Sequence, residues 1–485
     1  MNITLISLER ELFCYGIRVL SSCLRKAGHN VKLIFLIPQE SKSAADKFRI
    51  IYSEEVLDAL EKVVSEDDLI GFSLMSNQFI QASDVTRFLK SRNVSAPIIW
   101  GGIQPTVEPK ECLEYADMIC IGEGEEALLE LADQMENDQD YLKTQNIWFK
   151  TEGGIVQNSV RPLLKDLNQL PLPDYSCENH FIASDGKINP LTKKTIIQFQ
   201  GERFKSKKKS IVYMIMTSRG CLFNCTYCVN SFFHSLYPKQ KLIRWRSEEN
   251  IIKELKMIQE EFCPISYVYF VDDNFTARSN EALRLFCNKY RTKINVPFFA
   301  QVSPLTISEE KMELLFSSGC AHVTMGIETA SERIAELYNR SKEHKILPQA
   351  IAIVEKYRSK MNPPPTYQFI IDNPYESLND TLETLKLAVS FPRPWYNPIY
   401  SLVLFPGVPL YSKAMKDGFI IDKYSQIYGK NWRSHSKVFF QIWIRIYRAN
   451  MSPIILKLLL RPWIARLFTT TPINAILKTR IFRWL

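Results

Sequence analysis

The first 140 residues alternate between apolar runs of strand length and segments with helical periodicity. In chain order these segments lie at 3–8, 16–28, 31–37, 54–64, 68–75, 81–91, 97–102 and 118–135. Apolar runs that lack a polar position at every second residue are typical of strands buried on both faces of a sheet. Strands that alternate with helices predict an α/β fold, and here a doubly wound layered domain over residues 1–140.

The alternation stops at residue 141 and begins again at 211. The segment 141–210 holds a hairpin-like stretch around Gly153 and Gly154 and a basic run at 204–210, so we expect a linker whose basic run is a solvated loop. Strands of the second alternation are expected at 211–216, 267–271, 298–302, 322–327, 367–371 and 400–405. Six strand-and-helix pairs without a Gly-rich dinucleotide fingerprint predict a partial (β/α)6 barrel of the TIM type over 211–410, with its active site at the C-terminal ends of the strands.

The composition is that of a folded protein in a reducing compartment. With 485 residues, of which 46% are hydrophobic and 23% charged, the chain can form two or three domains and is not of the disordered type. Its eleven cysteines are odd in number and irregularly spaced, which excludes a secreted disulfide framework. The N-terminus lacks the features of a signal peptide, so we expect a cytoplasmic protein.

Three cysteines form a tight cluster directly after the first expected barrel strand. Cys221, Cys225 and Cys228 have the spacing CxxxCxxC, and His234 is the nearest candidate for a fourth ligand. Structural zinc sites use four protein ligands, usually as two separated pairs, so a compact trio fits zinc poorly. Iron–sulfur clusters normally take four thiolates, and three leave one iron open to bind another molecule. The spacing therefore favours a 4Fe–4S cluster that binds a further ligand.

The segment TSRGCLFNCTYCVN (217–230) resembles the radical S-adenosylmethionine (SAM) superfamily. That family's pattern is CxxxCxxC after the first barrel strand, with an aromatic residue, here Tyr227, before the last cysteine. The resemblance implies that the three cysteines hold a 4Fe–4S cluster whose open iron chelates the amino and carboxylate groups of SAM. It further implies reductive cleavage of SAM to a 5′-deoxyadenosyl radical, and a reductase such as flavodoxin or ferredoxin as the electron donor.

Further family elements match at the ends of later strands. YFVDDNFT (269–276) ends the second expected strand, and MGIETAS (325–331) ends the fourth. The resemblance implies cofactor contacts from the following side chains: Asp272, Asp273, Glu328 and Ser331. The alternative is that residues of these two segments cap the helices that follow.

The fifth expected strand ends in FIIDNPYES (369–377), which resembles the family element Gly-x-Pro-Gly-Glu-Thr. Pro374 and Glu376 match this element, whereas Asp372 and Tyr375 replace its glycines. We therefore expect the backbone to approach ligands less closely at this strand end.

The layered domain resembles the cobalamin-binding domain that precedes the barrel in one large radical SAM subfamily. The matching segments, 16–31, 101–106 and 121–131, place glycines after strands, where ligands bind an open parallel sheet. The resemblance implies a Rossmann-like domain that binds cobalamin near Gly101, Gly102, Gly122 and Gly124. The loop 8–16 contains no histidine to ligate cobalt, a feature that many members of this subfamily share. The alternative is a Rossmann-like domain that only packs against the barrel.

The last part of the chain, 411–485, is expected to be a basic, aromatic-rich helical extension. From residue 426 onward there are eleven Lys or Arg, no Asp or Glu, and four of the eight Trp. Within 452–468, Lys457 and Arg461 share one helical face and Pro462 interrupts the helix. Three interpretations stay open: contact of 430–485 with a membrane surface or a lipid-like substrate, packing on the barrel, and nucleic-acid binding, which the apolar content disfavours. No window is long and apolar enough for a transmembrane helix.

These features predict a cobalamin-dependent radical SAM methyltransferase that acts on an unactivated carbon or a phosphinate-type phosphorus of a small-molecule substrate. The first alternative is a radical cyclase or rearrangement enzyme on the same scaffold. The second is a methylthiotransferase, a family with three further cluster cysteines in its N-terminal domain, a pattern that Cys14, Cys23, Cys112 and Cys120 do not follow. The third is a non-enzymatic iron–sulfur binding module.

Overall fold

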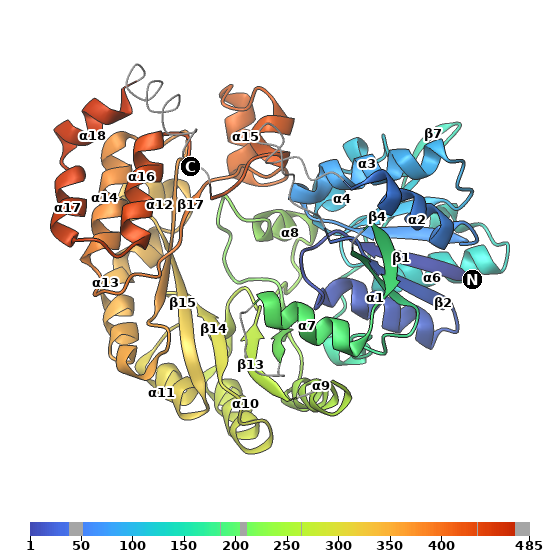
Figure 1. Cartoon of the computed structure of the whole chain (residues 1–485), viewed down its shortest axis with the longest axis horizontal. Helices are drawn as coiled ribbons and strands as arrows, with labels where there is room; N and C mark the ends of the chain where they lie inside the picture. Colours follow the sequence, from blue (N-terminus) through green and yellow to red (C-terminus); the bar gives the residue numbers. More distant parts are fainter. Residues whose placement is uncertain (38–51, 185, 204–210, 263, 434, 471–485) are drawn as a thin grey trace.

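Two sheets organise the chain. The computed structural model describes residues 1–37, 52–184, 186–203, 211–262, 264–433 and 435–470, so the basic run at 204–210 and the end of the tail at 471–485 lie outside it. The first sheet has nine strands and the second has six. They stand side by side in Figure 1, with the N-terminal sheet on the right and the curved second sheet on the left.

Parallel strands form the centre of the first sheet, where the alternating pattern predicted them. The strands are β1 (Asn2–Ser7), β2 (Asn30–Phe35), β3 (Leu69–Ser73), β4 (Ile98–Gly101) and β5 (Met118–Cys120). The helices are α1 (Tyr15–Lys26), α2 (Glu54–Val64), α3 (Phe79–Ser91), α4 (Ile103–Val107), α5 (Pro109–Cys112) and α6 (Glu125–Glu136). Leu5 of β1 belongs to the core on the α1 side, while the next residue, Ile6, belongs to the core on the α2 and α3 side. The doubly wound layered domain is therefore confirmed.

The segment expected to be a linker instead extends this sheet at both edges. It contributes β6 (Ile147–Thr151), β7 (Gly154–Gln157), β8 (His180–Ser184) and β9 (Lys187–Pro190), followed by α7 (Lys193–Arg203). The strand order is β7-β6-β5-β4-β3-β1-β2-β8-β9, and the hairpin around Gly153 and Gly154 forms as expected. The outermost strands, β7 and β9, are short and have no buried position, and such edge strands carry little of the apolar signal that marks central ones.

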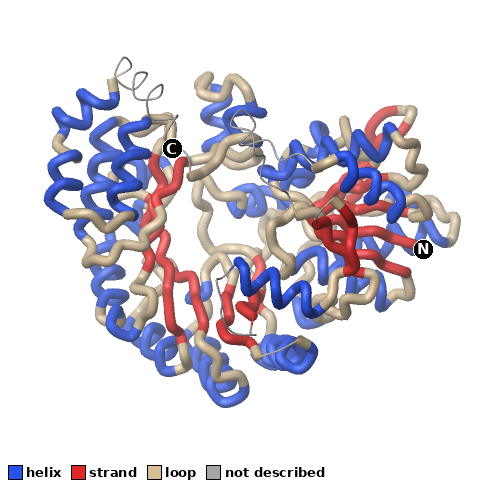
Figure 2. Tube along the Cα trace, in the orientation of Figure 1, coloured by secondary structure: helices blue, strands red, loops and turns tan. Residues whose placement is uncertain are grey.

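The second sheet is a parallel half-barrel in the order β10-β13-β14-β15-β16-β17. Its strands are β10 (Ile211–Ile215), β13 (Ile265–Phe270), β14 (Phe298–Val302), β15 (Cys320–Glu328), β16 (Thr366–Ile371) and β17 (Ile399–Ser401). Its helices are α8 (Asn230–Leu236), α9 (Glu248–Glu261), α10 (Asn280–Lys293), α11 (Glu309–Ser317), α12 (Glu332–Leu337), α13 (Ser341–Glu355) and α14 (Leu378–Ser390). Figure 2 shows α9, α10, α11, α13 and α14 on the outer, convex side of the strands, whereas α8 lies between the sheet and the N-terminal domain. The six predicted strand-and-helix pairs are confirmed.

Smaller elements complete the connections. A two-stranded antiparallel sheet joins β11 (Ser218–Arg219) to β12 (Arg244–Trp245). Short 3₁₀ turns lie at Ser76–Gln78, Tyr141–Lys143, Leu167–Gln169, Phe275–Ala277 and Arg358–Lys360. The pairing of Ser218 with Trp245 and of Arg219 with Arg244 fixes the chain just before the cysteine trio.

Two groups of aromatic contacts hold the N-terminal domain, one against the half-barrel and one against the C-terminal extension. Near the start of the barrel, the ring of Tyr213 on β10 lies 5.1 Å from Phe13 and 5.8 Å from Tyr175. At the other end, Tyr428 stacks on Phe79 of α3 at 4.5 Å between ring centroids. The space between the domains is therefore bounded by packed side chains on both sides.

The C-terminal extension is helical over its described part. Its elements are α15 (Pro409–Lys416), a π-helical turn (Tyr424–Tyr428), α16 (Val438–Arg448), α17 (Pro453–Leu459) and α18 (Pro462–Thr469). The predicted interruption at Pro462 is present, and this proline starts α18 because the first helical position needs no N–H donor. Both α17 and α18 contact α14 and α16. No helix in the described ranges is long and apolar enough to cross a membrane.

Candidate active site

The cysteine trio lies in a loop that leaves the C-terminal end of β10 and runs into α8. Thr226, in the middle of this loop, donates from its backbone N to the Tyr338 carbonyl (3.2 Å) and from its hydroxyl to the Leu337 carbonyl (2.7 Å). The Cys228 backbone N donates to the Cys225 carbonyl (3.0 Å). The Thr226 bonds hold the loop against the C-terminal end of α12. The Cys228–Cys225 hydrogen bond fixes the backbone conformation between these two thiols.

Polar side chains contact two of the thiols. Arg340 Nη1 donates to Cys225 Sγ (3.7 Å), and Asn230 Nδ2 donates to Cys228 Sγ (3.6 Å). N–H donors to sulfur are a usual feature of iron–sulfur sites. In the described part of the chain, no three His, Cys, Asp or Glu side chains lie close enough to share a single metal ion, as a zinc site with Zn–S bonds of about 2.3 Å requires. Three thiols with such donors fit a 4Fe–4S cluster that keeps one iron without a protein ligand.

Asp272 and Asp273 follow β13 but differ in what they contact. Asp272 is buried, and its Oδ1 accepts hydrogen bonds from the backbone N of Thr217 (2.6 Å) and of Ser218 (2.7 Å). Its Oδ2 accepts from the Thr217 hydroxyl and lies 3.6 Å from Arg278 Nη2. Both oxygens are thus engaged in holding the start of the cysteine loop.

Asp273 instead faces the space between the domains. Its Oδ2 accepts from Asn230 Nδ2 (3.1 Å), the same amide group that contacts Cys228, and its side chain lines the cavity described below. The residue is exposed, but the protein around the carboxyl desolvates it in part and raises the pKa of Asp273. Of the two aspartates, Asp273 is the one with an oxygen available to a ligand.

Glu328 ends β15 beside the cysteine loop. Its backbone is in the left-handed region (φ +70°), which turns the chain sharply at the strand end. Burial raises the pKa of its carboxyl, although Arg340 and the Tyr227 hydroxyl oppose the shift. Arg340 also donates to the Gly326 carbonyl (2.9 Å) and to Cys225 Sγ, so one guanidinium connects the end of β15 with the cysteine loop.

Ser331 acts as a helix cap in this structure. Its hydroxyl accepts a hydrogen bond from the Ile334 backbone N (3.4 Å) at the start of α12, and it donates to the Asp380 carboxylate. Ser331 is 2% exposed. This is the capping role that the sequence left open as the alternative for this segment.

Glu376, in the element after β16, is a buried carboxyl with one oxygen unpartnered. Its Oε2 accepts from the Asp372 backbone N (3.1 Å) and the Thr381 hydroxyl (3.2 Å), whereas Oε1 has no hydrogen-bond donor among the described residues. Burial raises the pKa of this carboxyl to about 8. The folded protein therefore keeps a proton on Glu376 up to about pH 8, while the unfolded chain loses it near pH 4.5.

Replacing Glu376 by Gln is expected to stabilise the protein at alkaline pH only. Since the folded state binds the extra proton, wild-type stability falls as pH rises from about 4.5 to 8. The neutral amide removes that loss, so we expect E376Q to gain about 2 kcal/mol at pH 8.5 and nothing at pH 4. Urea unfolding at both pH values measures the difference, and an equal effect at both would contradict the buried protonated carboxyl.

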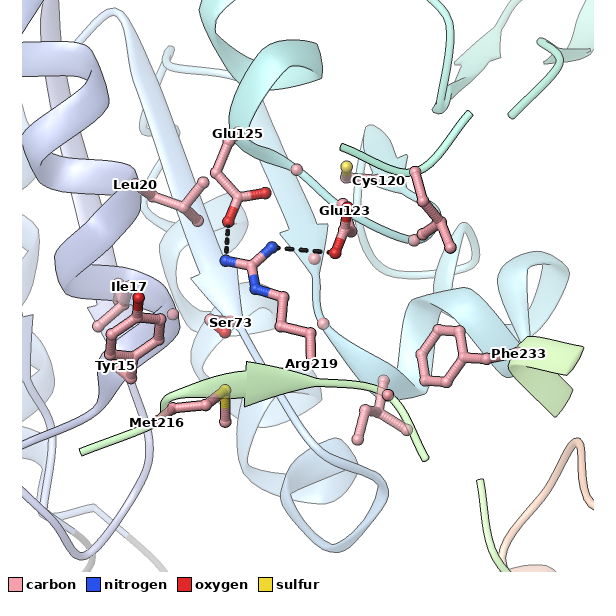
Figure 3. A pocket seen from close by; sticks show the side chains of 18 of the residues that line it. Tyr15, Ile17, Leu20, Ser73, Cys120, Glu123, Glu125, Met216, Arg219 and Phe233 are labelled. Atoms are coloured by element: carbon pink, nitrogen blue, oxygen red, sulfur yellow. Dashed lines mark hydrogen bonds and ion pairs between the residues drawn. The ribbon is translucent and has the colours of Figure 1, made fainter. Parts of the chain in front are cut away.

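A cavity of about 390 Å³ lies between the C-terminal edge of the first sheet and the cysteine loop. Its floor is apolar and consists of Leu5, Ile17, Leu20, Ile99 and Leu128. The barrel side is formed by residues at the start of the cysteine loop and on α8, including Met216, Arg219 and Phe233 (Figure 3). The cavity thus opens on both the sheet edge and the loop that carries the thiols.

The four glycines expected to bind cobalamin all line this cavity: Gly101, Gly102, Gly122 and Gly124. Two of them have no room for a side chain. At Gly102 (φ +97°) a Cβ atom would lie 2.6 Å from the Leu74 carbonyl oxygen, and at Gly122 (φ +77°) it would lie 1.9 Å from the Tyr237 hydroxyl. Glycine at these positions lets the backbone turn close to the cavity.

Ion pairs connect the turn that contains Gly122 and Gly124, here called the glycine-rich turn, to the start of the cysteine loop (Figure 3). Arg219 Nη1 lies 3.0 Å from Glu123 Oε1, and its other terminal nitrogen bonds to Glu125. Arg244 Nη2 is 2.8 Å from the same Glu123 oxygen. Burial raises the pKa of the Glu123 carboxyl, but hydrogen bonds and charge from Arg244 and Arg219 outweigh it and lower the pKa overall. The sequence reasoning missed both arginines, because their partners are distant in the chain.

The cavity suits a flat, bulky cofactor with an apolar face. Aliphatic side chains form the floor, glycine backbone forms the rim, and no histidine is present among the described residues that line it. The donor set therefore fits cobalamin without a protein histidine on cobalt, as the loop 8–16 indicated.

Comparisons with known proteins agree with this geometry. The family model of the radical SAM superfamily matches residues 215–388, and that of the B12 binding domain matches residues 1–132. An uncharacterized methyltransferase of Pyrococcus horikoshii is 24% identical over 431 residues, which cover 87% of this chain and 81% of that protein. A cytidylyl-2-hydroxyethylphosphonate methyltransferase of Streptomyces wedmorensis is 25% identical over 353 residues, covering 67% of this chain and 63% of the relative.

Solved structures with the same fold include TsrM and OxsB. TsrM of Kitasatospora setae, a radical SAM methyltransferase solved with cobalamin and a [4Fe-4S] cluster, has a TM-score of 0.62 at 15% identity, covering 86% of this chain and 75% of TsrM. OxsB, a cobalamin-dependent SAM radical enzyme, has a TM-score of 0.60 at 17% identity, covering 93% of this chain and 62% of OxsB. With both domains matched, the chain belongs to the radical SAM enzymes that carry an N-terminal cobalamin-binding domain.

Proposed function

We propose that the protein is a methyltransferase that acts on an unactivated carbon or a phosphinate-type phosphorus of a small-molecule substrate. The observation that carries the proposal is the cavity with a glycine rim and an apolar floor, which opens directly on the cysteine loop. When bound, the cluster supplies the electron that cleaves SAM, and cobalamin supplies a carrier for the methyl group. Two relatives with methyltransferase names support the same reaction class.

The chain's own residues would position these groups. Cys221, Cys225 and Cys228 are the proposed cluster ligands. Asp273 and Glu328 are the proposed contacts of SAM, because both carboxyls lie beside the cysteine loop, Asp273 in the lining of the cavity and Glu328 at the end of β15. Asp272 and Ser331 are proposed to act on SAM through the loops that they hold, since their polar atoms are engaged within the protein. A one-electron reductase such as flavodoxin or ferredoxin is the proposed partner.

The apolar lining of the cavity would exclude water from the reacting groups. A 5′-deoxyadenosyl radical abstracts hydrogen without discrimination, so a site that generates it must keep solvent and side reactions away. Arg219 and Arg244 close the side of the cavity next to the glycine-rich turn by their ion pairs with Glu123 and Glu125. We infer that these contacts keep the proposed cobalamin site, at the glycines, and the proposed SAM site, at the cysteine loop, in one enclosed space.

Incubation of the reduced, cobalamin-loaded protein with SAM labelled on its methyl group tests the proposal. Without any added substrate, a methyltransferase is expected to move the label from SAM to the cobalamin fraction and to release S-adenosylhomocysteine, as chromatography and mass spectrometry would show. A cyclase or rearrangement enzyme on the same scaffold would form 5′-deoxyadenosine and leave the label on SAM or on methionine. That second result, with cluster and cobalamin both intact, would overturn methyl transfer.

A further inference from the structure

Helices α17 and α18 carry a concentrated exposed apolar surface. Of the nineteen large apolar side chains exposed in the described part of the chain, seven lie between residues 451 and 468. We define the C-terminal apolar face by six of them: Ile454, Ile455 and Leu458 on α17, and Trp463, Leu467 and Phe468 on α18. Ile454 is 79% exposed and Trp463 is 64% exposed. Scattered apolar residues are ordinary on protein surfaces, but a contiguous group of this kind marks an interaction site.

The same two helices are anchored to the barrel by their opposite sides. Leu456 and Leu460 are fully buried, as is Ala465 on α18. The Trp443 indole of α16 donates to the Leu456 carbonyl (3.2 Å). The helices are therefore a folded part of the protein whose outer side stays exposed. In Figure 1 they lie at the far left, on the side away from the N-terminal domain.

The charges on these helices are all positive. Lys457, Arg461 and Arg466 are exposed between the apolar side chains, and in the described ranges none of them forms an ion pair. No Asp or Glu occurs from residue 426 to the end of the chain. Short amphipathic helices with Trp and aliphatic side chains beside Lys and Arg are typical of segments that lie in the interface of an anionic bilayer.

Other occupants fit this surface less well. Two copies that paired face to face about a two-fold axis would bring the same three cations against one another, with no acidic residue nearby to compensate them. Nucleic acid would require basic side chains that follow phosphates, and here aliphatic side chains separate them. A surface that is apolar and cationic at once is complementary to a lipid bilayer with anionic headgroups.

We propose that the C-terminal apolar face binds the surface of an anionic lipid bilayer, with α17 and α18 lying in the plane of the interface. The apolar side chains insert among the lipids at the level where headgroups meet acyl chains, and the three cations contact the headgroups. The catalytic cavity is formed by other elements and remains free. This proposal is independent of the reaction that the enzyme catalyses.

Vesicle flotation of the full-length protein tests this assignment. Phosphatidylcholine vesicles with and without 30% phosphatidylglycerol are the probes. We expect binding to the anionic vesicles, weaker binding in 0.5 M NaCl, and little binding to neutral vesicles. I454S combined with W463S should lower the partition coefficient more than tenfold. K457Q should lower it about fivefold, the effect of one basic residue near an anionic surface.

I421S is the matched control, because Ile421 is 91% exposed but lies outside α17 and α18. It should bind vesicles as the wild-type protein does, and all variants should keep wild-type far-UV circular dichroism and SAM cleavage. No binding of the wild-type protein, or equal binding of the I454S/W463S variant, would overturn the proposal. Dimerisation in analytical ultracentrifugation that I454S/W463S abolishes would assign the face to a second copy of the chain instead.

Discussion

Replacing Cys225 by alanine is expected to remove the iron–sulfur cluster and to abolish the formation of 5′-deoxyadenosine. Only three thiolates are available to the cluster, so the loss of one leaves two irons without a protein ligand. Cys225 is also the thiol that Arg340 contacts, at 3.7 Å, so its removal breaks the link between the cluster loop and the end of β15. Iron and sulfide analysis after anaerobic reconstitution measures the first effect, and chromatography of dithionite-reduced reactions measures the second.

C287A is the matched control for this variant. Cys287 is 2% exposed on α10, far along the chain from the trio, and its replacement removes a buried thiol of the same size. We expect C287A to keep its iron content and its SAM cleavage, with a small loss of stability from the vacated volume. A C225A protein that kept four irons and formed 5′-deoxyadenosine would contradict the assignment of the trio.

Replacing Arg219 by methionine is expected to destabilise the protein by about 3 kcal/mol, because it leaves partly buried carboxylates without a counter-charge. Arg219 bridges Glu123 and Glu125, whose side chains are 23% and 9% exposed. Both glutamates lie on the turn that carries Gly122 and Gly124, so the turn should also lose its orientation toward the cavity. We expect cobalamin binding to weaken more than tenfold, as measured by absorbance titration.

Two further variants distinguish a role of Arg219 in orienting the glycine-rich turn from a general loss of protein stability. R92M removes a surface arginine whose ion pair with Asp58 (2.9 Å) joins side chains more than 40% exposed, and it should cost less than about 1 kcal/mol. Combining R219M with E125Q removes one stranded charge and should recover part of the lost stability without restoring cobalamin binding. If R219M behaved like R92M in thermal unfolding and in cobalamin titration, Arg219 would have no positioning role.

The enclosure of the active site depends on contacts between parts of the chain that are far apart in sequence. On one side Tyr213 packs against Phe13 and Tyr175, and on the other Tyr428 accepts a hydrogen bond from Gln104 (3.0 Å) and donates to Glu111 (2.8 Å). Burial raises the pKa of the Tyr428 hydroxyl, which therefore stays protonated and can donate to the carboxylate. These contacts hold the cobalamin-binding domain over the open side of the half-barrel.

The elements that sequence reasoning located well are those whose pattern is set by local burial. Apolar runs such as 298–302 and amphipathic helices such as 378–390 coincide with β14 and α14, because a strand buried on both faces and a helix with one buried face leave direct periodic signals. Strands β8 and β9 were missed for the opposite reason. The edge strand β9 is partly exposed, and β8 joins β2 only because the chain returns to that side of the sheet.

The sequence by itself determined the chemistry of the site: a three-cysteine loop after the first barrel strand and glycines at the strand ends of a layered domain. These are local features, fixed by spacing and by backbone geometry that only glycine adopts at low cost. Only the tertiary structure decided how the candidates are used. It engages Asp272 within the protein and turns Asp273 to the cavity, it places Arg340 between Cys225 and Gly326, and it pairs Arg219 with Glu123 and Glu125. Long-range pairings of charge depend on how the domains pack, and no periodicity along the chain records them.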